Sequence, residues 1–356
     1  MLEDGFFLEG EAFAGSGEVF GEVVFNTTTF GYQEVITDPA SSGQILTMTY
    51  PLIGNIGINK DSEQADSPQI AALLVREYSP FPSSWLSEGD LASYLNSHGV
   101  LAVEGIDTRA LTRHLSESGT QRGVLSTLDL NVESLLTKLK QEKKELDLPK
   151  REEIQTIGSG DYHVVVMDFG ATKQLLASLV QLGCRLTIVP ATASAAEILN
   201  FSPDGILLSS GPSDPASFPE IIQEVKKLLG VKPVFGIGFG HLLLGLANGF
   251  NTFKLSAGHR GTNQPVLDLA KERVLVTNQN HGYCLSVPGI EKIRKAREAK
   301  TLGGSWQVTH VNLNDCTVEG MAYPKGFSVQ YIPDFAGSDF CLFDKFRRMM
   351  EEEAHA

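Results

Sequence analysis

One segment combines the strand, the glycines and the helix of a catalytic turn, but its central residue carries no reactive group. The apolar run 233–237 predicts a buried strand, and the run 241–247 predicts a helix soon after it. Hydrolases expose a nucleophile at such a turn, where glycines tolerate the tight backbone and N–H groups can stabilise an oxyanion. The residue at the apex is Gly238, which has no side chain. The sequence therefore predicts a scaffold for covalent catalysis without its nucleophile.

Length, charge and cysteine content restrict the classes of function that the other residues can serve. The chain has 356 residues, which is too long for one ordinary core and predicts two or three domains. A formal net charge of −14 argues against a nucleic-acid or anionic-membrane partner. No apolar run is long enough to span a membrane, and the acidic N-terminus does not resemble a secretory signal. The four cysteines lie far apart, so we expect reduced thiols in a cytoplasmic protein.

The turn lies in the second of two domains that the residue pattern predicts. Residues 1–150 contain short strands separated by turn-forming residues, and they predict a small, β-rich mixed domain. A charged stretch leads into a predicted linker at 151–160. Residues 161–356 alternate strands with helices, which predicts an α/β fold with a doubly wound, mostly parallel sheet. In such a fold, ligands bind beyond the carboxyl ends of the strands, where the turn at Gly238 should lie.

Several motifs occur in both halves of the chain in the order of one known family. They are Gly21–Thr27, Gly31–Glu34, Thr49–Asn55 and Gly105–Arg109 in the first half, and Asp168–Gly170, Ser210–Pro215, the turn at Gly238, Gln279–Tyr283 and Phe327–Gln330 in the second. The chain resembles the small, glutaminase subunit of carbamoyl phosphate synthase. Its second half is similar to a class I glutamine amidotransferase domain, and the resemblance covers nearly all of residues 1–346.

The resemblance implies a cysteine that attacks glutamine, a histidine that accepts its proton and a glutamate that orients the histidine. A thiol needs a base to form a thiolate at neutral pH, and the imidazole needs a fixed tautomer. Position by position, the nucleophile falls on Gly238, the base on Ile332 and the orienting acid on Asp334. We therefore expect a chain that has lost its glutaminase activity.

The positions that hold glutamine in the family are only partly retained. Ala40 stands where the family has a serine, although Ser41 is adjacent. A polar substrate atom left unpaired by an apolar replacement costs roughly 1–3 kcal/mol, so we expect impaired binding of L-glutamine. In the second domain Gly211, Asn280, Gly282 and Tyr283 fit the family pattern, whereas Ser213 replaces a glycine, Phe239 a leucine and Leu242 a glutamine.

The resemblance also implies a partner and a reaction. In the family, a large ATP-using subunit makes carbamoyl phosphate from bicarbonate and ammonia, for arginine or pyrimidine biosynthesis. The ammonia reaches that subunit from the small one. We expect this chain to dock on, stabilise or regulate a large subunit that uses free ammonia. We expect no cofactor in this chain, because ATP and its metal ion would belong to the large subunit.

Two alternatives remain open from the sequence. The first is a working glutaminase whose nucleophile is Cys284 or Cys341, although a free cysteine more often packs as a small apolar residue. The second is a stand-alone pseudoenzyme that binds glutamine or another metabolite. A metal site is not expected, because His241, His259 and His281 lack metal-ligand spacing. We predict instead that His281 holds its loop by side-chain hydrogen bonds.

Overall fold

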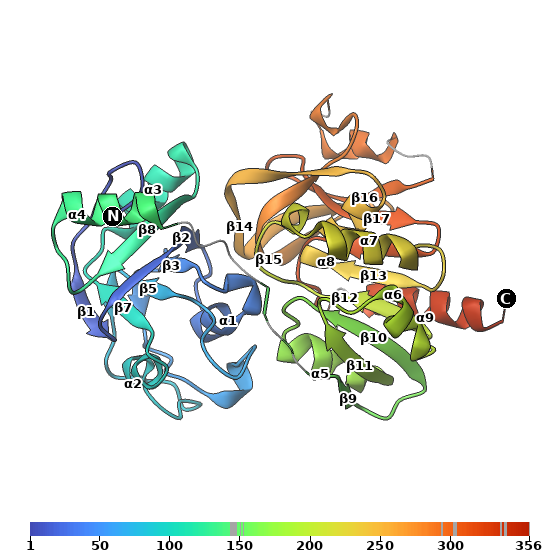
Figure 1. The fold of residues 1–356 in the computed structure, drawn as a ribbon, viewed down its shortest axis with the longest axis horizontal. Coiled ribbons are helices and arrows are strands. Elements are labelled where there is room, and N and C mark those ends of the chain that lie inside the picture. The colour runs from blue at the N-terminus through green and yellow to red at the C-terminus, as the bar shows by residue number, and fades with distance from the viewer. Residues whose placement is uncertain are drawn as a thin grey trace. The chain divides into compact units, whose positions relative to one another are not determined.

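The computed structural model divides the chain into two compact units, each with its own sheet and its own buried core (Figure 1). Unit 1 comprises residues 1–146 and 255–261, and unit 2 comprises residues 147–254 and 262–356. The structure describes all residues except 143–147, 150, 152, 293–294, 302–304, 335–336, 338–339 and 356. No helix in the described part of the chain is long and apolar enough to cross a membrane.

Unit 1 is a mixed α/β unit with two sheets and four α-helices among its described residues. The strands are β1 (Glu11–Ala14), β2 (Glu18–Asn26), β3 (Ile45–Met48), β4 (Leu52–Ile53), β5 (Ala72–Leu74), β6 (Glu77–Tyr78), β7 (Leu101–Glu104) and β8 (Gln121–Ser126). The helices are α1 (Tyr32–Thr37), α2 (Leu91–Ser97), α3 (Thr108–Ser118) and α4 (Val132–Gln141). The main sheet has six strands in the order β1-β7-β5-β3-β2-β8, and β4 pairs with β6.

The main sheet of unit 1 is covered on both faces. Its four central strands are parallel, and the two edge strands β1 and β8 are antiparallel to their neighbours. Successive side chains of a strand point to opposite faces. Accordingly Val24 and Leu46 pack with residues of α1 and α2, whereas Val23 and Ile45 pack with residues of α3.

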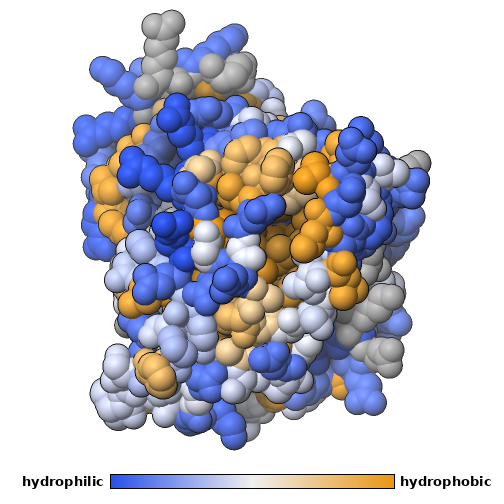
Figure 2. Space-filling view, turned by 90° about the vertical axis from the view of Figure 1, so that its left-hand side faces the viewer, coloured by the Kyte–Doolittle hydropathy of each residue, from blue (hydrophilic) through white to orange (hydrophobic). Residues whose placement is uncertain are grey.

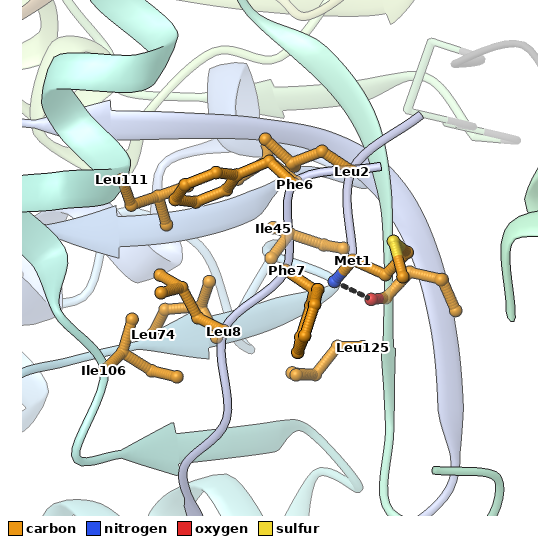
Figure 3. A pocket seen from close by; sticks show the side chains of 12 residues that line it. Met1, Leu2, Phe6, Phe7, Leu8, Ile45, Leu74, Ile106, Leu111 and Leu125 are labelled. Carbon is orange, nitrogen blue, oxygen red and sulfur yellow. Dashed lines mark hydrogen bonds between the residues drawn. The ribbon is translucent and has the colours of Figure 1, made fainter. Parts of the chain in front are cut away.

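An apolar pocket in unit 1 is too small for a metabolite. Phe6, Phe7 and Leu8 of the N-terminal segment line it together with sheet residues (Figure 3). It encloses about 40 Å³, whereas small-molecule sites measure roughly 300–1,000 Å³. The face drawn in Figure 2 shows hydrophobic residues gathered around a hollow. The Met1 ammonium at the pocket donates to the Val124 carbonyl oxygen at 3.1 Å, which ties the segment to the sheet.

Unit 2 is built on a ten-stranded sheet in the order β15-β14-β16-β17-β18-β13-β12-β10-β11-β9. Its strands are β9 (Gln155–Ile157), β10 (Tyr162–Asp168), β11 (Cys184–Pro190), β12 (Gly205–Leu208), β13 (Val234–Ile237), β14 (Asn251–Asp268), β15 (Arg273–Ser286), β16 (Gln307–Asn312), β17 (Val318–Tyr323) and β18 (Gly326–Val329). The helices are α5 (Lys173–Gln181), α6 (Ala195–Asn200), α7 (Pro219–Leu228), α8 (Phe239–Ala247) and α9 (Phe340–Ala354).

The central strands of unit 2 confirm the predicted doubly wound α/β arrangement. β11, β10, β12, β13 and β18 are parallel, and most of their residues are apolar because both of their faces are buried. Residues of α5 and α9 pack on one face, and residues of α6, α7 and α8 pack on the other. The carboxyl ends of the parallel strands therefore meet at one edge, where the Gly238 turn follows β13.

The sequence predicts a linker at 151–160 followed by a separate domain, and the structure differs from this prediction in two ways. The stretch predicted as a linker contains β9, an edge strand that pairs antiparallel with β11. In addition, the middle of β14 belongs to unit 1, where the carbonyl oxygen of Arg260 accepts hydrogen bonds from the backbone N–H of Thr27 at 3.2 Å and from its Oγ1 at 3.0 Å. Neither pairing has a signal within its own short segment, because each depends on residues far away in the chain.

Candidate active site

The turn between β13 and α8 has the backbone of a nucleophile elbow. Gly238 lies at φ 56° and ψ −109° and is the N-cap of α8, a conformation that residues with a side chain rarely adopt. Its N–H donates to the Val329 carbonyl oxygen at 2.9 Å, and the N–H of Gly240 donates to the Ser209 carbonyl oxygen at 3.0 Å. These bonds fix the apex between the neighbouring strands. The sequence prediction of a tight catalytic turn at this position agrees with this geometry.

The glycines on either side of the apex allow the strand and the helix to approach closely. A Cβ atom on Gly236 would lie 2.6 Å from the Gly240 carbonyl oxygen. A Cβ atom on Gly240 would lie 2.2 Å from the Leu208 carbonyl oxygen. Both distances are far inside van der Waals contact, and the obstructing atoms belong to the backbone. Any larger residue at either position would therefore push α8 away from the sheet.

The apex itself is much less crowded than its neighbours. A Cβ atom on Gly238 would lie 3.3 Å from Cβ of Ser210 and 3.7 Å from the Gln330 carbonyl oxygen. The first contact would need a shift of only a few tenths of an ångström. Crowding therefore does not exclude a side chain at the apex. The missing nucleophile is a property of the residue type at this position and not of the surrounding space.

The positions predicted for the base and the orienting acid follow β18, the parallel neighbour of β13. Ile237 pairs with Val329, so residues after the two strands leave the sheet at the same edge. The N–H of Ile332 donates to the Asn278 carbonyl oxygen at 2.9 Å, and its side chain is half-buried. Asp334 is exposed. An aliphatic side chain cannot accept a proton, so no base stands at position 332.

The loops after β10 and β12 retain a closely packed backbone beside the turn. A Cβ atom on Gly211 would lie 2.5 Å from the Phe169 carbonyl oxygen, so only glycine fits there. Ser210 Oγ donates to the Gly170 carbonyl oxygen at 3.1 Å and ties the two loops together. Ser213, at the predicted second glycine position, has φ 79°, which is the left-handed region that glycine favours. Ser213 therefore has a backbone conformation that a glycine would adopt more easily.

Phe239 and Leu242 contribute to the core of unit 2. The Phe239 side chain is 3% exposed and packs against Phe169 and Phe218, with ring centroids 5.3 and 6.1 Å away. Leu242 is also 3% exposed and lies in an apolar cluster that the Tyr283 side chain contacts. Phe239 can therefore offer a ligand its backbone N–H, and Leu242 offers no polar group. Leu242 therefore cannot make the hydrogen bond that the family resemblance predicts for a glutamine at this position.

The segment 279–283 is held by a buried polar network that sequence reasoning found only in part. His281 lies within β15 and not in a loop as predicted, but it makes the predicted side-chain hydrogen bonds: Nδ1 lies 2.9 Å from the Tyr283 carbonyl oxygen and Nε2 lies 3.0 Å from Gln279 Oε1. Gln279 Nε2 donates in turn to Oε2 of Glu319 at 3.0 Å. Asn312 Nδ2 donates to Oε1 of the same carboxylate at 3.3 Å. The fully buried Glu319 was missed, and its only sequence signal is a glutamate within an otherwise apolar strand.

His241 is the histidine nearest to the apex in the chain, but it is enclosed in the core of unit 2. It is fully buried, and its Nδ1 lies 2.8 Å from Ser328 Oγ. Burial, with a smaller effect from His310, lowers the pKa of His241 to about 3, so the imidazole stays neutral. A base must exchange protons with substrate or solvent. His241 therefore serves the packing of α8 on β18 and does not replace the base missing at position 332.

The two cysteines weighed as substitute nucleophiles differ in their surroundings. Cys284 is fully buried, and burial raises the pKa of its thiol well above the usual value, which confirms the packing interpretation. Cys341 is exposed, so the packing interpretation is wrong for this residue. Its Sγ lies 2.9 Å from Nζ of Lys271, in the turn after β14. Three strands separate β14 from β13 in the sheet, so this contact does not place Cys341 at the Gly238 turn.

Ala40 and Ser41 belong to unit 1 and are part of a short 3₁₀ helix, Pro39–Ser41. Asp38 caps this helix by accepting a hydrogen bond from the Ala40 N–H at 2.9 Å. Ala40 is 6% exposed and Ser41 is 1% exposed, so both residues are buried. Their predicted role in holding glutamine remains a prediction.

The sheet order and the elbow define unit 2 as a class I glutamine amidotransferase fold. The family described as "Glutamine amidotransferase class-I" matches residues 165–349, and "Carbamoyl-phosphate synthase small chain, CPSase domain" matches residues 1–125. The chain belongs to the carbamoyl phosphate synthase small chain family, and membership of this family implies a large-subunit partner.

The similarity to individual relatives extends over the whole chain. The carbamoyl phosphate synthase small chain of Syntrophotalea carbinolica is 41% identical, over 99% of this chain and 97% of that one. The corresponding chain of Listeria monocytogenes serotype 4b is also 41% identical, over 100% and 98%. A solved glutamine amidotransferase structure from Thermotoga maritima aligns with 54% of this chain and 89% of its own, at 14% identity and a TM-score of 0.36.

Proposed function

We propose that this chain is a small subunit of carbamoyl phosphate synthase that no longer hydrolyses glutamine. Its remaining role is to dock on the large subunit and to stabilise or regulate it while that subunit uses free ammonia. The observation that carries the proposal is the elbow at Gly238, whose backbone is preserved while its apex has no nucleophile. The half-buried Ile332 at the base position supports the same conclusion.

The chemistry of amide hydrolysis explains why these two changes are decisive. Covalent catalysis needs a nucleophile at the apex and a base within hydrogen-bond reach of it. Removing the nucleophile of a related triad lowers kcat by about 10⁶-fold, and losing the base as well costs little more because the two groups act as a unit. Backbone N–H groups such as that of Phe239 could still polarise a carbonyl, but they supply neither a bond to carbon nor a proton.

The surroundings of the turn support weakened glutamine binding as part of this proposal. Gly211, Asn280 and Gly282 keep the family pattern, whereas Leu242 buries an aliphatic group where the family has an amide. A bound glutamine would leave at least one polar atom without a partner there, at a cost of about 1–3 kcal/mol. This corresponds to a loss of roughly ten- to hundredfold in affinity.

We assign the reaction to the complex of this chain with its large subunit, and not to this chain alone. The large subunit would combine bicarbonate, ammonia and ATP into carbamoyl phosphate for arginine or pyrimidine biosynthesis, in the cytoplasm. We propose that this chain binds no cofactor and that ATP and its metal ion are held by the large subunit. The family membership supports the partner, and the formal net charge of −14 argues against a nucleic-acid partner.

The test is to purify the chain together with its large subunit and to compare two nitrogen donors. We expect carbamoyl phosphate to form with ammonium chloride and not with glutamine, and the isolated chain to release no ammonia from glutamine. Glutamine-dependent synthesis at a rate close to that with ammonium would overturn the proposal. If ammonia is released, Cys284→Ser and Cys341→Ser variants show whether either thiol is the nucleophile. Gly238→Ala is the matched control for these two variants, because it changes the elbow and leaves both thiols in place.

A further inference from the structure

The contact between Cys341 and Lys271 joins two nucleophilic side chains from separate elements of unit 2. Cys341 lies in the first turn of α9 and is the one exposed cysteine of the four in the chain. Lys271 lies in the turn between β14 and β15, and its Nζ is 2.9 Å from the Cys341 sulfur. The residues are 70 positions apart, so the fold of unit 2 brings them together.

The turn that carries Lys271 is held in place by a buried carboxylate. Asp268 is 6% exposed, and its Oδ1 accepts the backbone N–H groups of Ala270 at 2.9 Å and of Lys271 at 3.0 Å. Its Oδ2 lies 3.8 Å from Lys271 Nζ. One turn further along α9, the Lys345 ammonium lies 4.4 Å from the centroid of the Phe327 ring. The backbone of Lys271 is therefore fixed beside Cys341 by Asp268, whereas the Lys345 side chain lies against the Phe327 ring.

The other three cysteines lack the exposure of Cys341. Burial raises the pKa of Cys184 to about 12, and it raises the pKa of Cys284 well above the usual value and that of Cys316 as well. The thiolate is the form of cysteine that oxidants attack, so these three thiols react slowly. Exposure together with a neighbouring amine distinguishes Cys341 from every other thiol of the chain.

We propose that Lys271 and Cys341 form an oxidation-dependent covalent bridge in which one oxygen atom joins Nζ to Sγ. The oxidant is dioxygen. The S–H bond, one N–H bond of the neutral amine and the O–O bond break, and S–O and O–N bonds form. The second oxygen atom leaves as water with the two hydrogen atoms. Sulfur and nitrogen each lose two electrons, and dioxygen gains four.

The spacing of the two atoms matches a bridge of one atom. Two single bonds that share one atom place their outer atoms roughly 2.5 Å apart, and bonds to sulfur are longer than those between carbon and nitrogen. The observed distance of 2.9 Å from Nζ to Sγ therefore requires little movement of either element. A direct sulfur–nitrogen bond would need a considerably closer approach.

The bridge should form faster as the pH rises, because the Lys271 ammonium must lose a proton before its nitrogen can bond to oxygen. The hydrogen bond to Cys341 raises the pKa of Lys271, and the Asp268 carboxylate acts in the same direction, while burial and Arg273 oppose it. Once formed, the bridge would tie the first turn of α9 to the β14–β15 turn. Such a link restricts the unfolded chain as a disulfide does and would stabilise unit 2 reversibly.

The experiment compares the full chain, purified under argon with dithiothreitol, before and after exposure to buffer equilibrated with ¹⁸O-labelled dioxygen. Trypsin should then yield residues 261–273, uncleaved after Lys271, joined to residues 326–345, which contain Cys341. The expected mass is the sum of the two peptides plus one labelled oxygen atom and minus two hydrogen atoms. Dithiothreitol should release the pair.

Two variants make the test specific. Lys271→Arg keeps the positive charge, and we expect complete loss of the joined peptides while Cys341 becomes fully alkylated by iodoacetamide. Lys345→Arg is the matched control and should form the bridge as the wild type does. The proposal is overturned if Lys271 stays cleavable while Cys341 is found as a thiol, a sulfinic acid or a disulfide. A joined peptide pair without the added oxygen, or one formed through Lys345, would overturn it equally. None of these results depends on the glutaminase assay.

Discussion

Alanine substitutions at three glycines around α8 should separate backbone strain from crowding at the elbow. Gly238→Ala places a side chain at φ 56°, and such a conformation costs about 1–3 kcal/mol of stability. Gly249→Ala tests φ 89° in open space, where no atom lies within 4 Å of the new Cβ, and should cost about 1 kcal/mol. Gly240→Ala replaces a glycine in the first turn of α8, so propensity alone predicts a gain of up to about 1 kcal/mol.

The structure predicts the opposite sign for Gly240→Ala. The new Cβ would lie 2.2 Å from the Leu208 carbonyl oxygen, and overpacking of this kind typically costs about 1–3 kcal/mol. Because the obstructing atom is backbone, the relief must come from a shift of α8 as a whole. We therefore expect a net loss of up to about 2 kcal/mol despite the better helix propensity.

Urea unfolding followed by tryptophan fluorescence measures these differences in unit 2. Trp306 packs edge-on against Phe250 with centroids 5.0 Å apart, so its emission should change when unit 2 unfolds. Trp85, in unit 1, is 90% exposed and should change little. A neutral or stabilising Gly238→Ala would refute the elbow geometry. A Gly240→Ala variant more stable than the wild type would refute the close approach of α8 to β12.

Three further predictions concern buried or strained polar residues of unit 2. Burial holds the pKa of folded His241 at about 3, against 6.5 when free; stability should therefore fall as the pH drops from 6.5 towards 3. His241→Gln should flatten this dependence of the urea midpoint, and an unchanged slope would contradict the reasoning. Glu319→Gln should cost about 1–3 kcal/mol, because its new amide would face the donors of Gln279 and Asn312; an unchanged midpoint would exclude this network. Ser213→Gly should raise stability by about 0.5–1 kcal/mol by relieving a residue at φ 79°, and a lower melting temperature would show that the serine is not strained.

Local residue patterns determined the elements that form the turn and several of the contacts beside it. The apolar run before Gly238 and the helical run after it predict β13 and α8, because burial and helix periodicity act over a few neighbouring residues. The glycines at 236, 238 and 240 predict a tight turn, and this signal too lies within a few neighbouring residues. His281 was also predictable, since its hydrogen-bond partners Gln279 and Tyr283 lie two residues away.

Tertiary structure alone decided the contacts between distant segments. Glu319 is buried because β17 lies beside β16, and its partners come from 40 residues and 7 residues away. The exposed Cys341 meets Lys271 only because α9 begins next to the β14–β15 turn. The middle of β14 belongs to unit 1, and its acceptor there, the Arg260 carbonyl oxygen, is a backbone group that every residue type has. Such contacts depend on which surfaces the folded chain brings together, and a short stretch of sequence does not contain that information.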